Sequence, residues 1–386
     1  MTRVRVRGWW LLAILAGVAL LVPWPATLVE ELYSRRAYRL VQATVTRASN
    51  LTGLAVIDGL LVCAAALVVW WGARLFRSDS GHGVGSRVWE VARRLVRTVA
   101  VIVLLFAVVW GLNYKRVPLE ATLGGSVVDP QQLLVLAENA ATGANATRAA
   151  AVSAAVEFEA AAARLAPAFA VTLERLGLPG LSVPGRPKHS VVLTPFFTAA
   201  GVTGMVNPLA LESIVHPELL PFERPMVLAH EWAHLAGFAD EADASALAWA
   251  VCRLGDPALH YSAHMFVVLE TASALPADQW QQIRARLDPG VIDDLRALAE
   301  RLTGQQPVVR QTAFRVYDGY LKSNSVADGV RSYSRVLRVL LTPGMQALVP
   351  DHILSSWSRS SGVMGFEESP VRRSSGSASG PSVSGR

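Results

Sequence analysis

The sequence predicts a mainly helical membrane protein, in which three transmembrane helices precede an α+β domain with a small sheet. Three observations lead to this fold class. Long apolar runs occupy the first 112 residues, helical patterning covers most of the remainder, and short stretches near residue 200 have strand character. Hydrophobic residues make up 52% of the chain, and its mean hydropathy is +0.34. An ordinary soluble enzyme of this length is less apolar.

The predicted spans are residues 9–29, 51–71 and 95–112. The first two reach the length of about 20 residues that a helix needs to cross a bilayer. Tryptophans cluster at the ends of these runs, where amphipathic rings favour the membrane interface. The first run could instead be a signal peptide, because three arginines precede it, but no small-x-small cleavage site follows. A lipid bilayer is therefore the first expected partner.

Basic residues in the short loops predict the orientation. Arginines are frequent before the first span and in the 72–97 loop, which favours a cytoplasmic N-terminus. We expect a multi-pass protein of the cell membrane, with residues 1–112 as the membrane region. A domain at 113–350 would lie outside the cytoplasm, and a Ser/Gly-rich tail at 355–386 would be disordered.

Charge and cysteine content exclude other classes. The 36 Lys and Arg residues exceed the 30 Asp and Glu residues, but many arginines flank apolar runs and no basic stripe carries interleaved aromatics. No nucleic-acid partner is expected. Cys63 and Cys252 imply no disulfide framework. Asp58 falls within the second apolar run, where an acid suggests function, but it can equally mark the start of the span.

The domain after residue 113 has mainly helical patterning. Residues 129–177 predict two helices, broken at "ATGANAT" (141–147) and ended by "LGLPG" (176–180). "HSVVLTPFF" (189–197) predicts a strand, and "GVTGMVNP" (201–208) a second one. Residues 274–348 are again helical, with breaks at 288–290 and 303–307.

One segment, "LAHEWAHLAGFADEADAS" (228–245), carries metal-binding chemistry. His230 and His234 are four residues apart, so a helix places both on one face. Glu231 lies beside them and is suited to act on a metal-bound water. Pro225 fits the first turn of this helix and Gly237 its end. The H-E-x-x-H spacing predicts one Zn²⁺ per chain, with Glu231 as a general base. The competing interpretation is a surface helix with two solvated histidines.

Catalytic zinc usually takes three protein ligands and leaves a position for water. Asp240 imitates a longer motif in which a ligand follows six residues after the second histidine, yet it also suits the N-cap of a following helix. Asp243 would lie in the first turn of that helix, where acids favour the helix dipole. Glu241 is less needed for capping and reaches farther. Spacing alone favours Glu241 narrowly, with Asp240 and Asp243 as alternatives.

The segment 230–252, "HEWAHLAGFADEADASALAWAVC", resembles the zinc motif of a bacterial membrane family known as domain of unknown function 3810. Similar segments extend over most of the chain: "EELYSRRAYRL" (30–40), "WGLNYKRVPL" (110–119), "GMVNPLALES" (204–213), "LPFE" (220–223), "HYSAHM" (260–265) and "VYDGYLKSNSVADGVRSYSRVLRVLL" (316–341). More broadly the motif resembles gluzincin metallopeptidases, in which an E-x-x-A-D or E-x-x-A-N sequence supplies the third ligand.

The resemblance implies a gluzincin-like domain in which Glu241 is the third ligand. Ser245 replaces the acid or amide that ends the gluzincin motif and supports a histidine. Gluzincins pair an extended substrate with a strand upstream of the zinc helix, and Gly204, Met205, Val206 and Asn207 match that place. Glu212 matches a family position without an assigned role. Candidate groups for stabilising the transition state are Tyr261, His264, Tyr317 and Tyr333.

The expected function is therefore a membrane-anchored zinc metallopeptidase that hydrolyses peptide or protein substrates. One alternative is a zinc-binding scaffold or sensor without activity, which the departure at Ser245 suggests. Another is a zinc amidase that acts on a non-peptide or cell-wall amide. The sequence does not separate these alternatives.

Overall fold

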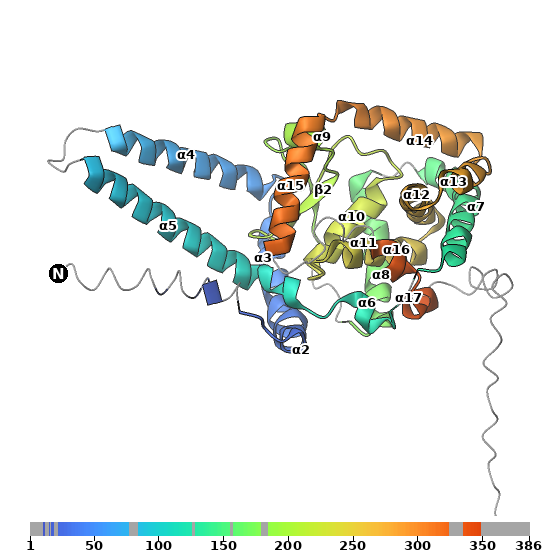
Figure 1. Cartoon of the computed structure of the whole chain (residues 1–386), viewed down its shortest axis with the longest axis horizontal. Helices are drawn as coiled ribbons and strands as arrows, with labels where there is room; N and C mark the ends of the chain where they lie inside the picture. Colours follow the sequence, from blue (N-terminus) through green and yellow to red (C-terminus); the bar gives the residue numbers. More distant parts are fainter. Residues whose placement is uncertain are drawn as a thin grey trace, which may run out of the picture.

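The computed structural model describes residues 22–76, 84–125, 128–154, 157–178, 184–323 and 335–348, with Leu11, Leu15, Gly17 and Val18. The chain is mainly helical and has one small three-stranded sheet, as the sequence predicts. A helical body carries the sheet, and two long helices project from one side of it (Figure 1). Tyr333 and the tail at 355–386 lie outside the described residues.

The projecting helices are α4 (Val56–Phe76) and α5 (Val84–Val109), which run in opposite directions as a hairpin (Figure 1). In the part of the chain that the structure describes, α4 alone is long and apolar enough to cross a membrane. The structure thus supports one of the three predicted spans. Most of the run 9–29 lies outside the described residues. Arginines occupy positions 93, 94 and 97 of α5. The uncharged part of the helix, residues 98–109, is therefore only about 18 Å long.

The helices before the hairpin belong to the body. They are α2 (Ala26–Leu28), the π-helical η1 (Val29–Ala37) and α3 (Tyr38–Asn50). The buried Tyr38 hydroxyl donates to Leu235 O at 2.9 Å, and the buried Thr46 hydroxyl donates to Leu211 O at 2.8 Å. After the hairpin, η2 (Gly111–Lys115) and α6 (Leu119–Thr122) lead into the rest of the body. The body is thus assembled from chain on both sides of the hairpin.

Helices α7 (Pro130–Ala154) and α8 (Phe158–Arg175) follow. The predicted break at 141–147 is wrong, because α7 runs through it. Gly143 lies directly against the ring of His264 on α12 (Pro257–Ala274), and a Cβ there would meet the ring at 2.1 Å. Small residues in this segment therefore permit close packing of two helices. The predicted end after α8 is confirmed by Gly177, which has φ +63°.

The sheet has the order β1-β3-β2, formed by β1 (Pro187–Lys188), β3 (Glu212–Val215) and β2 (Gly204–Asn207). β1 is parallel to β3, whereas β2 is antiparallel to it, with Gly204 opposite Val215. The strand predicted at 201–208 is confirmed. The strand predicted at 189–197 is wrong, because α9 (Thr194–Ala200) forms there, with a proline in its first turn and Gly201 at its end.

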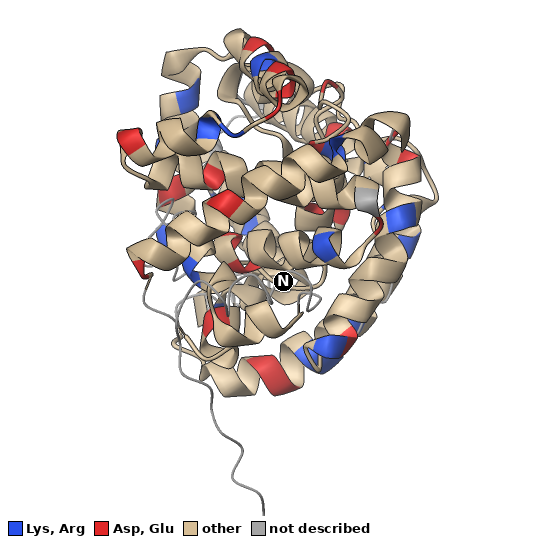
Figure 2. Cartoon of the chain, turned by 90° about the vertical axis from the view of Figure 1, so that its right-hand side faces the viewer, with Lys and Arg blue, Asp and Glu red and all other residues tan. Residues whose placement is uncertain are grey.

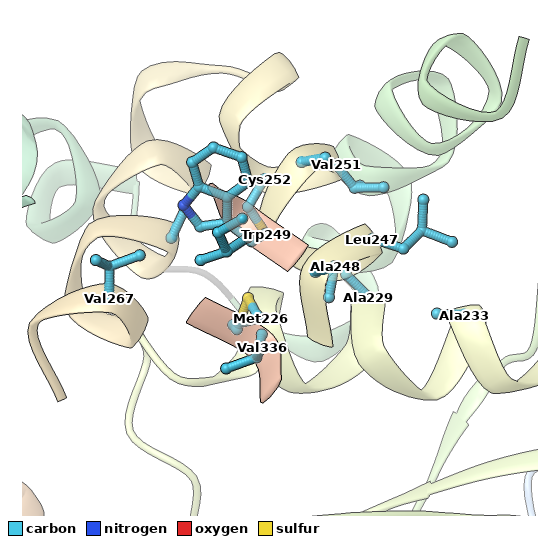
Figure 3. Close-up of a cluster of buried hydrophobic side chains, with 14 of the residues drawn as sticks. Met226, Ala229, Ala233, Leu247, Ala248, Trp249, Val251, Cys252, Val267 and Val336 are labelled. Atoms are coloured by element: carbon cyan, nitrogen blue, oxygen red, sulfur yellow. The ribbon is translucent and has the colours of Figure 1, made fainter. Parts of the chain in front are cut away.

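The core lies between α7, α8, α10 (Arg224–Leu235), α11 (Glu241–Leu254), α12 and α16 (Val336–Leu340). Figure 3 shows Met226, Ala229 and Ala233 of α10 facing side chains of α11, with Val267 and Val336 beside them. Both helices carry buried alanines, Ala229 and Ala233 on α10 and Ala244 and Ala248 on α11, and such small side chains allow the helices to pack closely. They therefore form a rigid support for the side chains that they carry.

The C-terminal helices are α13 (Ala277–Arg284), α14 (Pro289–Arg301), η3 (Leu302–Gly304), α15 (Pro307–Ser323) and α17 (Pro343–Leu348). The predicted breaks at 288–290 and 303–307 are confirmed, because α14 and α15 each begin at a proline. Helix α15 lies on the side of the body from which the hairpin leaves (Figure 1), and it contacts α9.

Candidate metal centre

The turn between α10 and α11 sets the geometry of the centre. Gly237 has φ +89°, a left-handed conformation that favours glycine and ends α10. Three residues later, the Asp240 side chain accepts hydrogen bonds from Ala242 N at 3.0 Å and Asp243 N at 3.2 Å. Asp240 is thus the N-cap of α11, which starts at Glu241. This short turn brings the first residue of α11 back to the histidines of α10.

His230, His234 and Glu241 lie together, with ligand atoms within 4.8 Å of one another. Glu241 Oε2 is 3.1 Å from His230 Nε2 and 3.5 Å from His234 Nε2. Tetrahedral zinc with ligands at about 2.05 Å separates its ligand atoms by about 3.3 Å. Two nitrogens and one carboxylate oxygen are also a donor set that zinc commonly takes. The three residues therefore fit one Zn²⁺ and leave a position for water.

The other ring nitrogen of each histidine already has a partner. His234 Nδ1 lies 2.7 Å from the Phe238 carbonyl oxygen, and His230 Nδ1 lies 3.2 Å from the Ser245 hydroxyl oxygen. Partners at Nδ1 fix the ring orientation and direct Nε2 toward the centre. Ser245, at the position where the gluzincin motif ends in an acid or amide, thus still contacts a histidine of the pair.

Glu231 is 3% exposed, and its Oε2 atom has no hydrogen-bond partner among the described residues. A buried carboxylate oxygen without a partner is uncommon and points to a ligand, ion or water. Burial raises the pKa of Glu231 to about 8 in the absence of a metal. Its Oε1 atom lies against β2, since a Cβ on Gly204 would come within 2.6 Å of it. Glu231 therefore lies between the metal cluster and the edge strand.

The charge of the cluster favours a cation. Burial acts to raise the pKa of Glu241, but the His234 charge and hydrogen bonds from both histidines hold it well below its usual range. Burial acts to lower the pKa of His234, but Glu241 outweighs burial and raises it to about 9. Burial lowers the pKa of His230. Glu241 is thus a buried anion that requires positive charge beside it.

The two neighbouring aspartates have other contacts. Besides capping α11, Asp240 accepts a hydrogen bond from Arg335 at 3.0 Å. Asp243 is buried, and its Oδ2 atom accepts a hydrogen bond from Leu119 N at 2.8 Å. Of the three acids that the sequence offers as third ligand, Glu241 is the one that lies between the histidines.

Of the four candidates for transition-state stabilisation, Tyr317 lies at the centre. Its hydroxyl donates to Glu241 Oε1, and its ring stacks on Tyr320 with centroids 5.9 Å apart. The Tyr261 hydroxyl instead donates to Asp294 at 2.5 Å. His264 Nε2 lies 2.9 Å from Arg253 Nη1, at the far end of α11. The structure thus places the polar atoms of Tyr261 and His264 away from the cluster.

Two acids that the sequence singles out have structural contacts. Asp58, in the first turn of α4, accepts hydrogen bonds from Val191 N at 2.8 Å and from the Ser190 hydroxyl. Glu212 is fully buried and pairs with Lys188 at 2.8 Å.

Sequence reasoning did not single out Trp110, whose indole donates to His234 O at 3.2 Å. Its place at the end of an apolar run resembles that of any interfacial tryptophan.

Residues 33–341 match a family model described as "Protein of unknown function (DUF3810)". No curated protein and no solved structure matches the chain.

Proposed function

We propose that this chain, which belongs to the DUF3810 family, is a membrane-anchored zinc metallopeptidase related to the gluzincins. The observation that carries the proposal is the cluster of His230, His234 and Glu241, with the buried Glu231 beside it. An H-E-x-x-H helix with a glutamate from the next helix supplies both the ligands and the general base of a metallopeptidase.

The mechanism assigns one task to each residue. When bound, zinc supplies Lewis-acid chemistry, which polarises a carbonyl and makes water nucleophilic near neutral pH. The three ligands hold the ion, while Ser245 and Phe238 O hold the histidine rings in place. Glu231 Oε2, free of protein partners among the described residues, takes the proton from the attacking water and returns it to the leaving amine.

The edge strand β2 supports a peptide substrate. It pairs with β3 on one side, and within the described part of the sheet no strand covers its other side. An extended peptide can add to such an edge through main-chain hydrogen bonds, which demand little of the peptide sequence. Gly204 holds this edge beside Glu231, so an added peptide would lie next to the general base.

The hairpin supports the membrane anchor. Large apolar side chains of both helices are exposed, including Val68 and Val69 of α4 and Ile102 and Leu105 of α5. Lipid, and not water, is the suitable solvent for such a surface. We propose that α5 also crosses the bilayer, since arginines near a helix end can extend their charges to the interface. With the run at 9–29 as a further span, the body lies outside the cytoplasm.

The Glu231→Gln variant tests the proposed activity. Because the change removes only the proton acceptor, zinc content should stay at one per chain while hydrolysis of a mixed peptide library falls by about 10²- to 10⁴-fold. Metal analysis and mass spectrometry of the peptides measure the two quantities. Equal peptide cleavage by the variant and the wild type would contradict the proposal. A wild type that binds zinc and cuts no peptide would favour a scaffold, a sensor or an amidase.

Reporter fusions test the orientation. We expect alkaline phosphatase joined after residue 355 to be active, because that enzyme requires an oxidising compartment for its disulfides. A fluorescent protein joined at the same position should remain dark in that compartment, and it serves as the control. A bright fluorescent fusion with an inactive phosphatase would place the body in the cytoplasm.

A further inference from the structure

Exposed apolar side chains surround the point where α4 leaves the body. Leu51 and Leu54, which directly precede α4, are 89% and 77% exposed, and Val191 and Val192 are 83% and 47% exposed. The loop with the two valines is fastened to α4, because Asp58 accepts a hydrogen bond from Val191 N. We name these four residues the apolar rim. Apolar side chains grouped in this way usually mark a contact surface.

A lipid surface is the occupant that fits the rim. The rim is continuous with α4, whose apolar window starts at Val56, two residues after Leu54. The opposite face of the body carries Lys, Arg, Asp and Glu residues scattered over its helices (Figure 2), as a face in water does. Apolar side chains beside a membrane helix can enter the boundary between headgroups and acyl chains by about 5–10 Å.

Glu212 joins this end of α4 to the sheet. Its carboxylate accepts hydrogen bonds from Val56 N at 2.9 Å and Ile57 N at 2.8 Å, at the start of α4. The same Oε1 atom that binds Ile57 N also accepts a hydrogen bond from Asn207 Nδ2, at 3.0 Å. The Asn207 amide and the first turn of α4 therefore lie within about 6 Å of each other.

Strand β2 leads from this junction to the centre. Asn207, at one end of β2, is held at the start of α4, while Gly204, at the other end, lies against Glu231. A strand of this length spans about 10 Å. Glu231, the general base, is thus separated from the start of α4, where that helix enters the bilayer, by about the length of one short strand.

We propose that the substrates are membrane-anchored polypeptides, cut within roughly ten residues of the point where they enter the bilayer. This inference rests on the proposed peptidase function. A chain added to the edge of β2 and leaving it at Asn207 reaches the lipid surface after only a few extended residues. Attachment to the same bilayer also raises the effective concentration of the substrate at the site.

A substrate with a repeated sequence tests the inference independently of sequence preference. The probe is a flexible segment built from copies of one block of about ten residues, anchored in a liposome through a lipid at either end. The full chain, reconstituted in the same liposomes, should cut the block next to the anchor at least about tenfold more often than distal blocks. Mass spectrometry of the fragments gives the cut positions, and the segment without its anchor is the control.

The outcomes separate the two proposals. Glu231-dependent cuts that fall equally in all blocks, for both anchor positions, would overturn the inference and leave the peptidase standing. No Glu231-dependent cut in either the anchored or the free segment would overturn the peptidase itself, together with the inference.

Contact of the rim with lipid is measured separately. An environment-sensitive fluorophore on Val191→Cys, in a Cys63→Ser background, should be quenched by spin-labelled lipids. The matched control is the same fluorophore on Val152→Cys, because Val152 is also an exposed valine, at 59%, on α7 at the end of the body opposite α4 (Figure 1). Equal quenching at both positions, or none at Val191→Cys, would overturn the lipid contact.

Discussion

At the scale of single residues, Glu241 uses its two carboxylate oxygens differently. Oε2 faces both histidines, whereas Oε1 accepts the hydrogen bond from Tyr317. The tyrosine thus fixes which oxygen is available to a metal ion, as partners of metal ligands usually do. Because Tyr317 comes from α15, 76 residues after Glu241 in the chain, sequence spacing could not rank it above the other candidates.

Substitution of the acids after the histidines tests the third ligand. Glu241→Ala should weaken zinc binding by more than about 100-fold. Removing a residue that only hydrogen-bonds to a metal ligand already lowers metal affinity by about 10- to 100-fold, and removing the ligand itself should lower it further. Asp240→Ala is the matched control: it should keep zinc and lose about 1 kcal/mol of stability with the N-cap. Zinc titration and thermal unfolding measure these effects. If Asp240→Ala abolished zinc binding while Glu241→Ala retained it, Asp240 would be the third ligand, as the longer motif spacing predicts.

At the scale of elements, short-range signals predicted the two helices of the centre. Pro225, Gly237 and Asp240 mark the start of α10, its end and the N-cap of α11, because each acts within a few residues of itself. The strand predicted at 189–197 failed because Ser190 is held by Asp58, a residue distant in sequence. Tertiary contacts of this kind override local strand propensity.

Helices α7 and α12 show the same limit of prediction from local sequence. The glycine at 143 suggests a helix break in the sequence, yet its lack of a side chain admits the His264 ring. We expect Gly143→Ala to destabilise the fold by about 1–3 kcal/mol through overpacking. Gly319→Ala is the control, since a Cβ at this position of α15 meets nothing within 4 Å. That change should be neutral or stabilising by up to about 1 kcal/mol. Equal melting temperatures for the two variants would contradict this account.

At the scale of the whole molecule, the buried pair of Glu212 and Lys188 fastens the body to the hairpin. Burial acts to raise the pKa of Glu212, but hydrogen bonds from Asn207, Lys188 and two amides of α4 lower it. A lowered pKa stabilises the folded state fully above the unfolded value of 4.5. This stabilisation is lost as the pH falls through the folded pKa.

We therefore expect the melting temperature of the wild type to fall steeply once the pH drops below about 4.5. Glu212→Gln should melt lower at neutral pH, because it leaves the Lys188 charge buried without its partner, and should depend less on pH in the acid range. Glu159→Gln, in an exposed pair with Arg186, is the control and should change little. A pH profile of Glu212→Gln as steep as that of the wild type would show that Glu212 does not govern the acid transition.

The position of α3 also bears on the order in which the molecule assembles. This helix is synthesised before the hairpin, yet its buried hydroxyl at Thr46 bonds to a carbonyl 165 residues later in the chain. On the ribosome, the buried groups of α3 therefore stay hydrated until the hairpin and about half of the body have been synthesised. Contacts so distant in sequence close slowly. The body can consequently reach its native state only late in synthesis, after both helices of the hairpin have left the ribosome.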